Sequence, residues 1–426
     1  MASATPASIN SHAMRPLPRA FVLPYGTRAS LARHLGRVAV TLLVTLLAGC
    51  VAPARHGSLP APPVPPVVTQ APQPAPSPAR TEKAELQPVS YSELPGWGDD
   101  RVSAGWQAFL RGCPALEAQP RWASVCEAAG SVAADDDSAV RAFLEARFIP
   151  HRVVAPGGAG EGLLTGYYEP LLRGGRSPDG RYRHPVYAPP DDLITVDLVA
   201  VAPDTRNLRL KGRLEGRKLV PYWSRAEIDR GRAPLAGREL AWVDDALDLF
   251  FLQIQGSGRI RLPDGSLLRV GYADQNGHPY RSVGRLLVER GELALEAASM
   301  QGIRDWARAN PAKVPELLAE NPSYVFFREL PSGNDGPPGS LGVPLTAGRS
   351  LAVDPSAVPM GAPVFIDSVM PGSEQPLRRL LAAQDTGGAI KGSVRADFFW
   401  GFGDEAGALA GRMRQPLRMW VLLPVP

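Results

Sequence analysis

The chain has 426 residues, of which 44% are hydrophobic, and this is enough for two domains or for one elaborate domain. Residues 1–49 contain five Arg and no Asp, Glu or Lys, so subtracting these five from the 46 basic residues leaves 41 basic against 42 acidic residues in the remainder. This balance in the body of the protein argues against a nucleic-acid partner.

The N-terminal segment resembles the leader of a bacterial lipoprotein. An apolar run, Val38–Gly49, follows three spaced Arg residues; it has the length of the hydrophobic part of a signal peptide and is too short to span a bilayer. It ends in Leu-Ala-Gly-Cys, which resembles a lipobox and implies cleavage before Cys50 and lipid attachment to its thiol; the alternative is a secretory leader with an incidental Cys. We therefore predict a signal peptide at residues 1–49. Because Val51 and not Asp follows the Cys, the resemblance implies an anchor at the periplasmic face of the outer membrane.

A proline-rich segment follows the predicted anchor. Residues 53–78 contain ten prolines, a composition that forms no packed core and favours polyproline II at about 3.1 Å per residue. We predict that residues 50–85 are a tether, whose 53–78 stretch alone reaches roughly 80 Å. The sequence leaves open whether translation begins at Met1 or Met14.

The remaining cysteines and the histidines give no sign of a metal site. In an oxidising compartment Cys113 and Cys126 favour a disulfide over a metal or redox site, although their pairing stays open. The three histidines of the body, His151, His184 and His278, lie far apart in the sequence and outside any zinc motif. We therefore predict no bound metal.

Hydrophobic periodicity predicts a mainly β protein with a few helices. Helical spacing of apolar residues occurs at 138–148, 282–291, 295–310 and 313–321. Residues 247–273 alternate apolar and polar side chains around Pro263-Asp264-Gly265, which predicts a hairpin. Short strands are predicted at 350–354, 361–367, 377–385 and 417–424, and their spacing favours a compact barrel.

The tripeptide Asp385-Thr386-Gly387 also occurs at the catalytic carboxylate of aspartic proteases. A protease of that kind needs two such carboxylates sharing a proton, from two loops of one chain or from two short subunits. This chain has a single copy and is far longer than a dimeric protease subunit, which disfavours that function. We interpret the tripeptide as a strand that ends in a tight turn.

Asp397 is the candidate general acid. It precedes Phe398, Phe399 and Trp400, and poor solvation beside aromatic rings raises the pKa of a carboxyl, as acid catalysis of glycosidic cleavage requires. From these residues alone, a surface Asp beside core aromatics is an equal alternative. Tyr and amide residues that suit a saccharide groove cluster elsewhere, in residues 164–170, 253–260, 271–282 and 321–327.

A series of ordered motifs resembles the membrane-bound lytic murein transglycosylase A family. The motifs run from about residue 88 to the C-terminus and are TGYYEP, SRAEID, LQIQGSGRI, YADQNGHPYRSVG, NPSYVFF, AVDPSAVPMG, QDTGGAIKG and ADFFWGFG. The last section resembles the three-aspartate domain of that family, with Asp354, Asp385 and Asp397 at the matching places. The resemblance implies a double-psi β-barrel built from residues 86–169 and 336–426, a second β domain inserted at 170–335, and a groove between them for a glycan strand.

The resemblance also implies a reaction. It is the cleavage of the β-1,4 bond between N-acetylmuramic acid and N-acetylglucosamine in peptidoglycan, with Asp397 as the single acid/base and a 1,6-anhydro ring as product. A single carboxyl is sufficient because the nucleophile is a hydroxyl of the substrate, and no cofactor is expected.

Further residues are assigned supporting roles. We expect Asp385 to orient Asp397 or nearby amides, although the loop from Asp385 to Asp397 is slightly longer than in some relatives, and we expect Asp354 to be structural. The residues expected to line the groove are Thr165, Gly166, Tyr167, Gln255, Ser257 and Tyr280.

Two other functions stay open. A peptidoglycan hydrolase would use the same groove and would need a second carboxylate, for which Asp385 or Glu169 is available. A non-catalytic wall-binding lipoprotein would need the groove but not Asp397. The sequence does not decide whether cleavage starts at chain ends, whether stem peptides are required, or whether the protein joins complexes that synthesise the cell wall.

Overall fold

The structure is a computed structural model that describes residues 84–203, 205 and 210–426. The predicted signal peptide, Cys50 and the proline-rich tether as far as residue 83 lie outside these residues. Within the described part of the chain, no helix combines the length and hydrophobicity that a membrane span needs.

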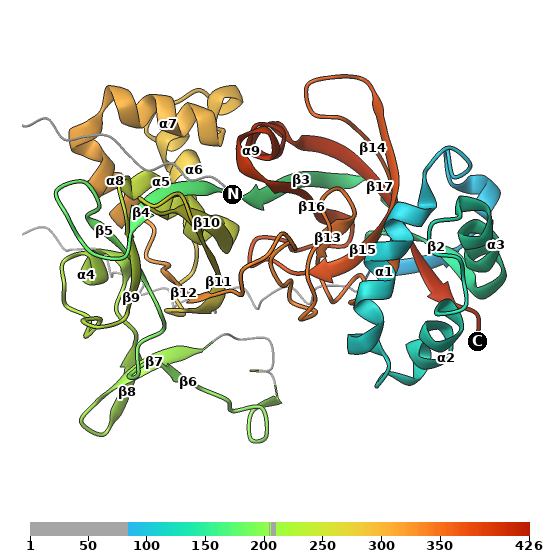
Figure 1. The fold of residues 1–426 in the computed structure, drawn as a ribbon, viewed down its shortest axis with the longest axis horizontal. Helices are drawn as coiled ribbons and strands as arrows, with labels where there is room; N and C mark the ends of the chain where they lie inside the picture. The colour runs from blue at the N-terminus through green and yellow to red at the C-terminus, as the bar shows by residue number, and fades with distance from the viewer. Residues whose placement is uncertain (1–83, 204, 206–209) are drawn as a thin grey trace, which may run out of the picture. The chain divides into compact units, whose positions relative to one another are not determined.

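The larger sheet joins the N-terminal and C-terminal parts of the described chain (Figure 1). Its strand order is β1-β2-β17-β14-β15-β13-β16-β3, and β3 pairs with β17 as well as with β16. The pairings from β17 through β14, β15, β13 and β16 to β3 therefore return to β17. The strands are β1 (Glu85–Pro88), β2 (Phe148–Val154), β3 (Gly162–Glu169), β13 (Ser350–Val353), β14 (Pro363–Val369), β15 (Pro376–Asp385), β16 (Arg395–Phe402) and β17 (Arg414–Pro424).

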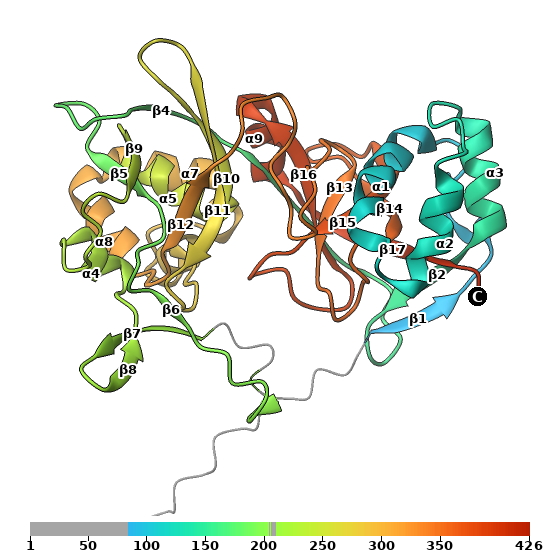
Figure 2. The same ribbon diagram turned by 60° about the horizontal axis from the view of Figure 1, so that its bottom comes forward.

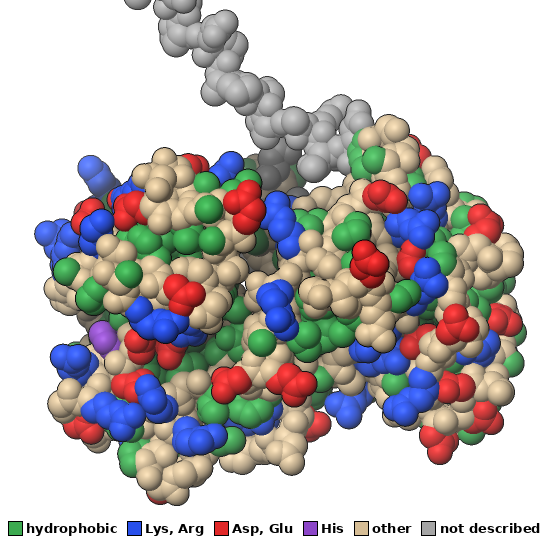
Figure 3. Space-filling view, turned by 90° about the horizontal axis from the view of Figure 1, so that it is seen from above, with side chains coloured by type: hydrophobic (Ala, Val, Ile, Leu, Met, Phe, Trp, Pro, Cys, Tyr) green, Lys and Arg blue, Asp and Glu red, His purple; other side chains and the backbone are tan. Residues whose placement is uncertain are grey.

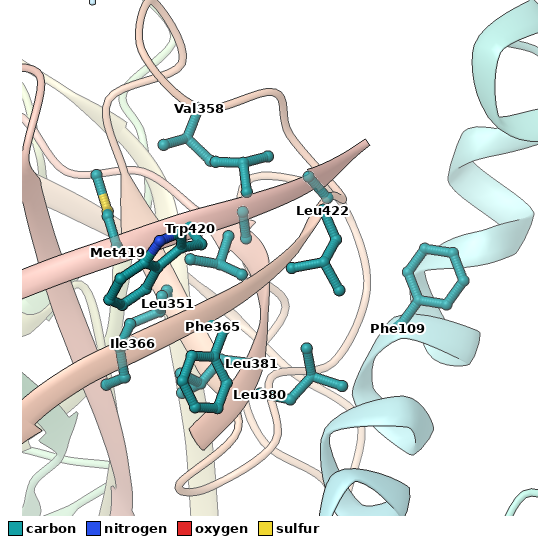
Figure 4. Packing of buried hydrophobic residues seen from close by; sticks show 14 of the residues in the cluster. Phe109, Leu351, Val358, Phe365, Ile366, Leu380, Leu381, Met419, Trp420 and Leu422 are labelled. Atoms are coloured by element: carbon teal, nitrogen blue, oxygen red, sulfur yellow. The ribbon is translucent and has the colours of Figure 1, made fainter. Parts of the chain in front are cut away.

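Three helices lie beside this sheet, next to β2 and β17 in both Figure 1 and Figure 2: α1 (Val102–Leu116), α2 (Pro120–Ala129) and α3 (Asp137–Arg147). A Cβ added to Gly105 would overlap the Leu380 carbonyl, so this glycine lets α1 approach β15 closely. Phe109 of α1 and Leu380 and Leu422 of the sheet belong to one cluster of buried hydrophobic residues, part of which Figure 4 shows. The strand β14 is buried over most of its length, and its residues 363–366 form a continuous apolar run.

The Cys113–Cys126 disulfide is present and joins α1 to α2, with a Cα–Cα distance of 5.4 Å. The structure thus confirms the pairing that the cysteine count favoured. The bond closes a short loop, and both cysteines are buried in the large core.

The chain between β3 and β13 forms a second, smaller sheet with its own helices (Figures 1 and 2). Its order is β12-β11-β10-β4-β9-β5, and a three-stranded sheet β6-β7-β8 accompanies it. The strands are β4 (Leu171–Gly175), β5 (His184–Tyr187), β6 (Ile194–Thr195), β7 (Lys211–Glu215), β8 (Lys218–Pro221), β9 (Glu239–Val243), β10 (Ser257–Arg261), β11 (Leu267–Gln275) and β12 (Val325–Glu329). The helices are α4 (Arg225–Asp229), α5 (Ala246–Gln255), α6 (Val283–Glu289), α7 (Met300–Ala309) and α8 (Val314–Ala319).

The described chain is therefore mixed α and β, mainly β, with an insertion that contains both kinds of element. The hairpin of β10 and β11 turns around Gly265, whose φ of 84° favours glycine, as the sequence predicted. The strand prediction is wrong for the first third of that segment, because residues 246–255 form the helix α5. The Asp245 carboxylate caps α5 by accepting from the Leu247 and Asp248 amides, and Gly256 ends it in the left-handed region.

Other predicted elements are confirmed with smaller differences. The predicted helix at 295–310 is interrupted because Ser299 caps the start of α7, leaving only a 3-10 turn, Leu295–Ala297, before it. The helices α1, α2 and α9 (Gly403–Arg412) and the strand β16 were not predicted. Figure 3 shows Lys and Arg interspersed with Asp and Glu over the face that it presents, in keeping with the balanced charge of the body.

Candidate functional site

Three neighbouring strands bring Asp385 and Asp397 to one part of the large sheet. Asp397 on β16 lies opposite Ala352 of β13, and Ala352 in turn lies opposite Asp385 at the end of β15. Two strand spacings separate the Cα atoms of the two aspartates, or about 10 Å. On its other side, Asp397 lies opposite Thr165 of β3.

The Asp397 carboxyl group is half-buried and has a specific hydrogen-bond donor. The Thr165 hydroxyl donates to Asp397 Oδ1 over 2.6 Å. Burial raises the pKa of Asp397 to about 6; the negative charge of Asp385 acts in the same direction, whereas the Thr165 hydrogen bond and the positive charge of Arg395 oppose it. A carboxyl group with such a pKa can donate a proton near neutral pH and accept one back.

The aromatic residues after Asp397 divide between the two faces of the sheet. Because side chains alternate along a strand, Phe399 shares the face of Asp397, where it packs against Tyr167 with ring centroids 5.2 Å apart. Phe398 faces the large core and contacts Trp400 with the two rings tilted by 50°. The low solvation of Asp397 therefore involves one residue of the aromatic run, Phe399, together with Tyr167.

Asp385 is held by three donors. The Ser340 amide and hydroxyl each donate to its Oδ1 over 2.9 Å, and the Tyr167 hydroxyl donates to its Oδ2 over 3.1 Å. Burial raises the pKa of Asp385, and these hydrogen bonds oppose the rise. Because the protein supplies donors to both oxygens, this carboxylate is suited to orienting its neighbours.

Asp354 fixes the loop of residues 386–394 that leads into β16. Its Oδ2 accepts from the Gly392 amide over 2.9 Å, and its Oδ1 accepts from the amide and hydroxyl of Ser356 over 3.0 and 2.8 Å. Burial alone would raise the pKa of Asp354, but these hydrogen bonds outweigh it and hold the pKa below its ordinary value. This aspartate is thus ionised and engaged with the backbone.

The remaining sequence-predicted site residues lie at several places. Thr165 and Tyr167 contact the two aspartates directly, whereas Gly166 points to the other face of β3, where an added Cβ would lie 2.7 Å from Trp400 Nε1. Gln255 accepts from the Tyr168 amide over 3.0 Å, and Ser257 is the buried first residue of β10. Tyr280 is 48% exposed and lines a pocket with Arg230 and Glu320 that none of the three aspartates lines.

A cavity of about 520 Å³ lies on the Tyr168 side of β3. It is lined by residues of α5, α7 and α9, among them Asp248, Arg304 and Asp404, and none of the three aspartates Asp354, Asp385 and Asp397 lines it. This cavity is therefore separate from the candidate acid.

Sequence reasoning missed two arginines that bind side chains of β3. Arg395 Nη2 donates to Thr165 Oγ1 over 2.8 Å, and Arg259 on β10 forms a buried ion pair with Glu169 at 3.0 Å. Arg395 lies two residues before Asp397, which places both on one face of β16, but this signal needs the strand assignment of residues 395–402, which the sequence analysis did not make.

Comparisons with known proteins agree with this arrangement. The profile of the MltA specific insert domain matches residues 163–328, and that of the 3D domain matches residues 349–423, which contain all three aspartates. A crystal structure of MltA from Neisseria gonorrhoeae is 40% identical, with a TM-score of 0.71; the match covers 80% of this chain and 93% of that one. The chain belongs to the membrane-bound lytic murein transglycosylase A family.

Two further family members define how far the likeness extends. Membrane-bound lytic murein transglycosylase A of Escherichia coli is 36% identical over 271 residues, which are 62% of this chain and 66% of that protein, just under two thirds of its length. A crystal structure of E. coli MltA with bound chitohexaose is 29% identical, has a TM-score of 0.60, and is matched over 81% of this chain and 96% of that one.

Proposed function

We propose that the protein is a lytic transglycosylase that cleaves the β-1,4 bond between N-acetylmuramic acid and N-acetylglucosamine in peptidoglycan. The observation that carries the proposal is the environment of Asp397: a half-buried carboxyl group whose pKa is raised to about 6, in a member of this family. The glycan-bound relative supports a saccharide as the substrate class.

The proposed reaction uses Asp397 twice. Its proton goes to the O4 atom of N-acetylglucosamine as the bond from that oxygen to C1 of the muramoyl sugar breaks. The resulting carboxylate then takes the proton of the muramoyl O6 hydroxyl as O6 bonds to C1, which closes the 1,6-anhydro ring. Donation requires the protonated acid, so kcat/KM of the free enzyme should fall about tenfold per pH unit above about 6.

The other carboxylates fit a hydrolase less well. Glu169 is the last residue of β3, four residues beyond Thr165. It is also fully buried in its ion pair with Arg259. Asp385 accepts three hydrogen bonds from the protein, so it is less available to activate a water molecule.

The architecture proposed with this function is a double-psi β-barrel of residues 86–169 and 336–426 and an inserted domain of residues 170–335, with the glycan groove between them. The returning strand pairings of the large sheet support the barrel. We further propose that lipid on Cys50 anchors the protein at the periplasmic face of the outer membrane; the relatives' name, membrane-bound, agrees with an anchor.

The test compares the parent protein with Asp397→Asn and Asp385→Asn on purified sacculi. We expect Asp397→Asn to lower the release of soluble muropeptides by about 10²- to 10⁴-fold while sedimentation with sacculi is retained, because an amide cannot donate the acid proton. Asp385→Asn should keep measurable turnover. Equal turnover of Asp397→Asn and the parent would refute the acid assignment, and sedimentation without turnover by the parent would favour a wall-binding protein.

A further inference from the structure

Arg395 extends the hydrogen-bonded chain behind the candidate acid. It lies two residues before Asp397 on β16, and its guanidinium is held by the carbonyl of Ala396 and by Thr165 of the neighbouring strand. The distances are 2.8 Å from Arg395 Nη2 to Thr165 Oγ1 and 2.6 Å from that oxygen to Asp397 Oδ1. Three side chains from two strands thus form one linear chain.

The chemistry of the three groups fixes the direction of this chain. A guanidinium has only donors, so Thr165 Oγ1 must accept from Arg395 through a lone pair. The hydroxyl hydrogen of Thr165 is then free to point at Asp397 Oδ1. If the acid proton were on Oδ1, the Thr165 oxygen would face two donors and its own hydrogen would lose its acceptor.

We propose that Arg395 is a positioning residue that orients the Thr165 hydroxyl and so assigns the acid proton of Asp397 to Oδ2. This inference rests on the proposed function, because it deepens the role of Asp397 as the acid. In each cycle the proton leaves from Oδ2 and returns to Oδ2, while Oδ1 stays bonded to Thr165.

Several charged or titratable groups surround this chain and act on it in different directions. On the Asp397 face these are Asp385 and Tyr167, while Lys391 and Asp354 lie in and beside the loop before β16. Arg414 of β17 lies directly opposite Thr165 and is exposed. Burial lowers the pKa of Arg395, but a guanidinium stays charged in proteins, so its effect is to stabilise the Asp397 carboxylate.

The experiment measures the titration of Asp397 in the full-length protein by the carbon-13 carboxyl resonance, assigned by its loss in Asp397→Asn. Arg395→Met and Thr165→Val should raise the midpoint by about one pH unit, because each removes a stabiliser of the carboxylate. Arg395→Lys and Thr165→Ser should restore most of the parental midpoint. Arg414→Met is the matched control; it removes an exposed cation at the same level of the sheet and should shift the midpoint by less than about 0.3 unit.

The pH profile of kcat/KM supplies the second readout. In Arg395→Met the alkaline limb of this profile should move to higher pH together with the titration midpoint of Asp397. Turnover at pH 5 should fall because the Thr165 hydroxyl is no longer oriented. An unchanged midpoint in Arg395→Met, or an equal shift in Arg414→Met, would overturn the proposal. A shifted titration midpoint of Asp397 with an unchanged alkaline limb of kcat/KM would support the hydrogen-bonded chain and overturn the assignment of Asp397 as the acid. Failure of this inference can therefore be distinguished from failure of the proposed function.

Discussion

Two carboxylates with little solvation lie at β3, Glu169 at its last residue and Asp397 opposite Thr165 in its middle, and different partners stabilise them. At the Glu169 end, the carboxylate pairs directly with Arg259, whose guanidinium also lies 4.0 Å from the Phe402 ring centroid. In the middle of β3, Asp397 receives a hydrogen bond from the neutral hydroxyl of Thr165, and the cation Arg395 lies behind that hydroxyl. Burial raises the pKa of both carboxyl groups.

The difference separates a structural role from a catalytic one. The ion pair with Arg259 opposes the rise in the pKa of Glu169 and ties this carboxylate to a buried guanidinium. A hydroxyl stabilises the Asp397 carboxylate only in part, so this group can change protonation near pH 6. The comparison predicts that removing Glu169, which leaves Arg259 without its partner, lowers stability, and that neutralising Asp397 raises stability at alkaline pH.

The largest effect is expected from breaking the buried pair. Glu169→Ala should lower the free energy of unfolding by about 3–5 kcal/mol, because it leaves Arg259 buried without its counter-charge. Urea unfolding measures this loss. The matched control is Glu329→Ala, which removes the half-exposed partner of Arg176 and should cost about 0–1 kcal/mol.

Equal losses in these two variants would contradict the role assigned to Glu169. The muropeptide products of any Glu169 variant that still folds should be the same as those of the parent. A change from anhydro to hydrated products would instead place Glu169 in the chemistry.

An opposite effect on stability is expected at Asp397. Its pKa is raised from 3.8 in the unfolded chain to about 6 in the folded protein, so folding favours the protonated form and stability falls as pH rises through this range. Asp397→Asn should therefore raise the free energy of unfolding by up to about 3 kcal/mol at pH 8, and the gain should vanish as pH approaches 3.8.

Asp354 supplies the contrast for this measurement. Its pKa is lowered in the folded protein, so its contribution is present above the ordinary pKa and lost as pH falls. Asp354→Asn should lower stability at pH 8. A loss of stability at pH 8 in both variants would show that Asp397 is not held in an unfavourable charged state.

The smallest effect is expected at Tyr167, which lies between Thr165 and Glu169 on β3. Tyr167→Phe removes the donor to Asp385 Oδ2 and keeps the ring that packs on Phe399, so it should cost about 1–2 kcal/mol of stability and raise the pKa of Asp385. Unfolding at pH 7 and the carboxyl titration measure both changes. An unchanged Asp385 titration would mean that Tyr167 does not help to hold this carboxylate.

The sequence indicated the chemistry of the site better than its geometry. Motif order and the aromatic neighbours of Asp397 selected the acid, but alternation along β16 shows that Phe399, and not Phe398, shares its face. Gly166 was selected with its neighbours, yet it faces Trp400 because successive residues of a strand point to opposite faces.

The secondary structure could also be predicted only in part from the sequence. The apolar run before Gly256 suits either a helix or a strand, and the capping carboxylate of Asp245 decides for the helix α5. Arg395 and Arg259 could not be assigned from the sequence, because their partners, Thr165 and Glu169, are remote in the chain and are reached only through strand pairing and packing.

The most direct measurement of the central claim is mass spectrometry of the muropeptides that the full-length protein and Asp397→Asn release from purified sacculi. A single carboxyl group acting with the substrate's own hydroxyl predicts products lighter by one water than hydrolysis products, and it predicts their absence with the variant. Hydrated products from the parent protein would contradict the account and would require a second carboxylate that activates water.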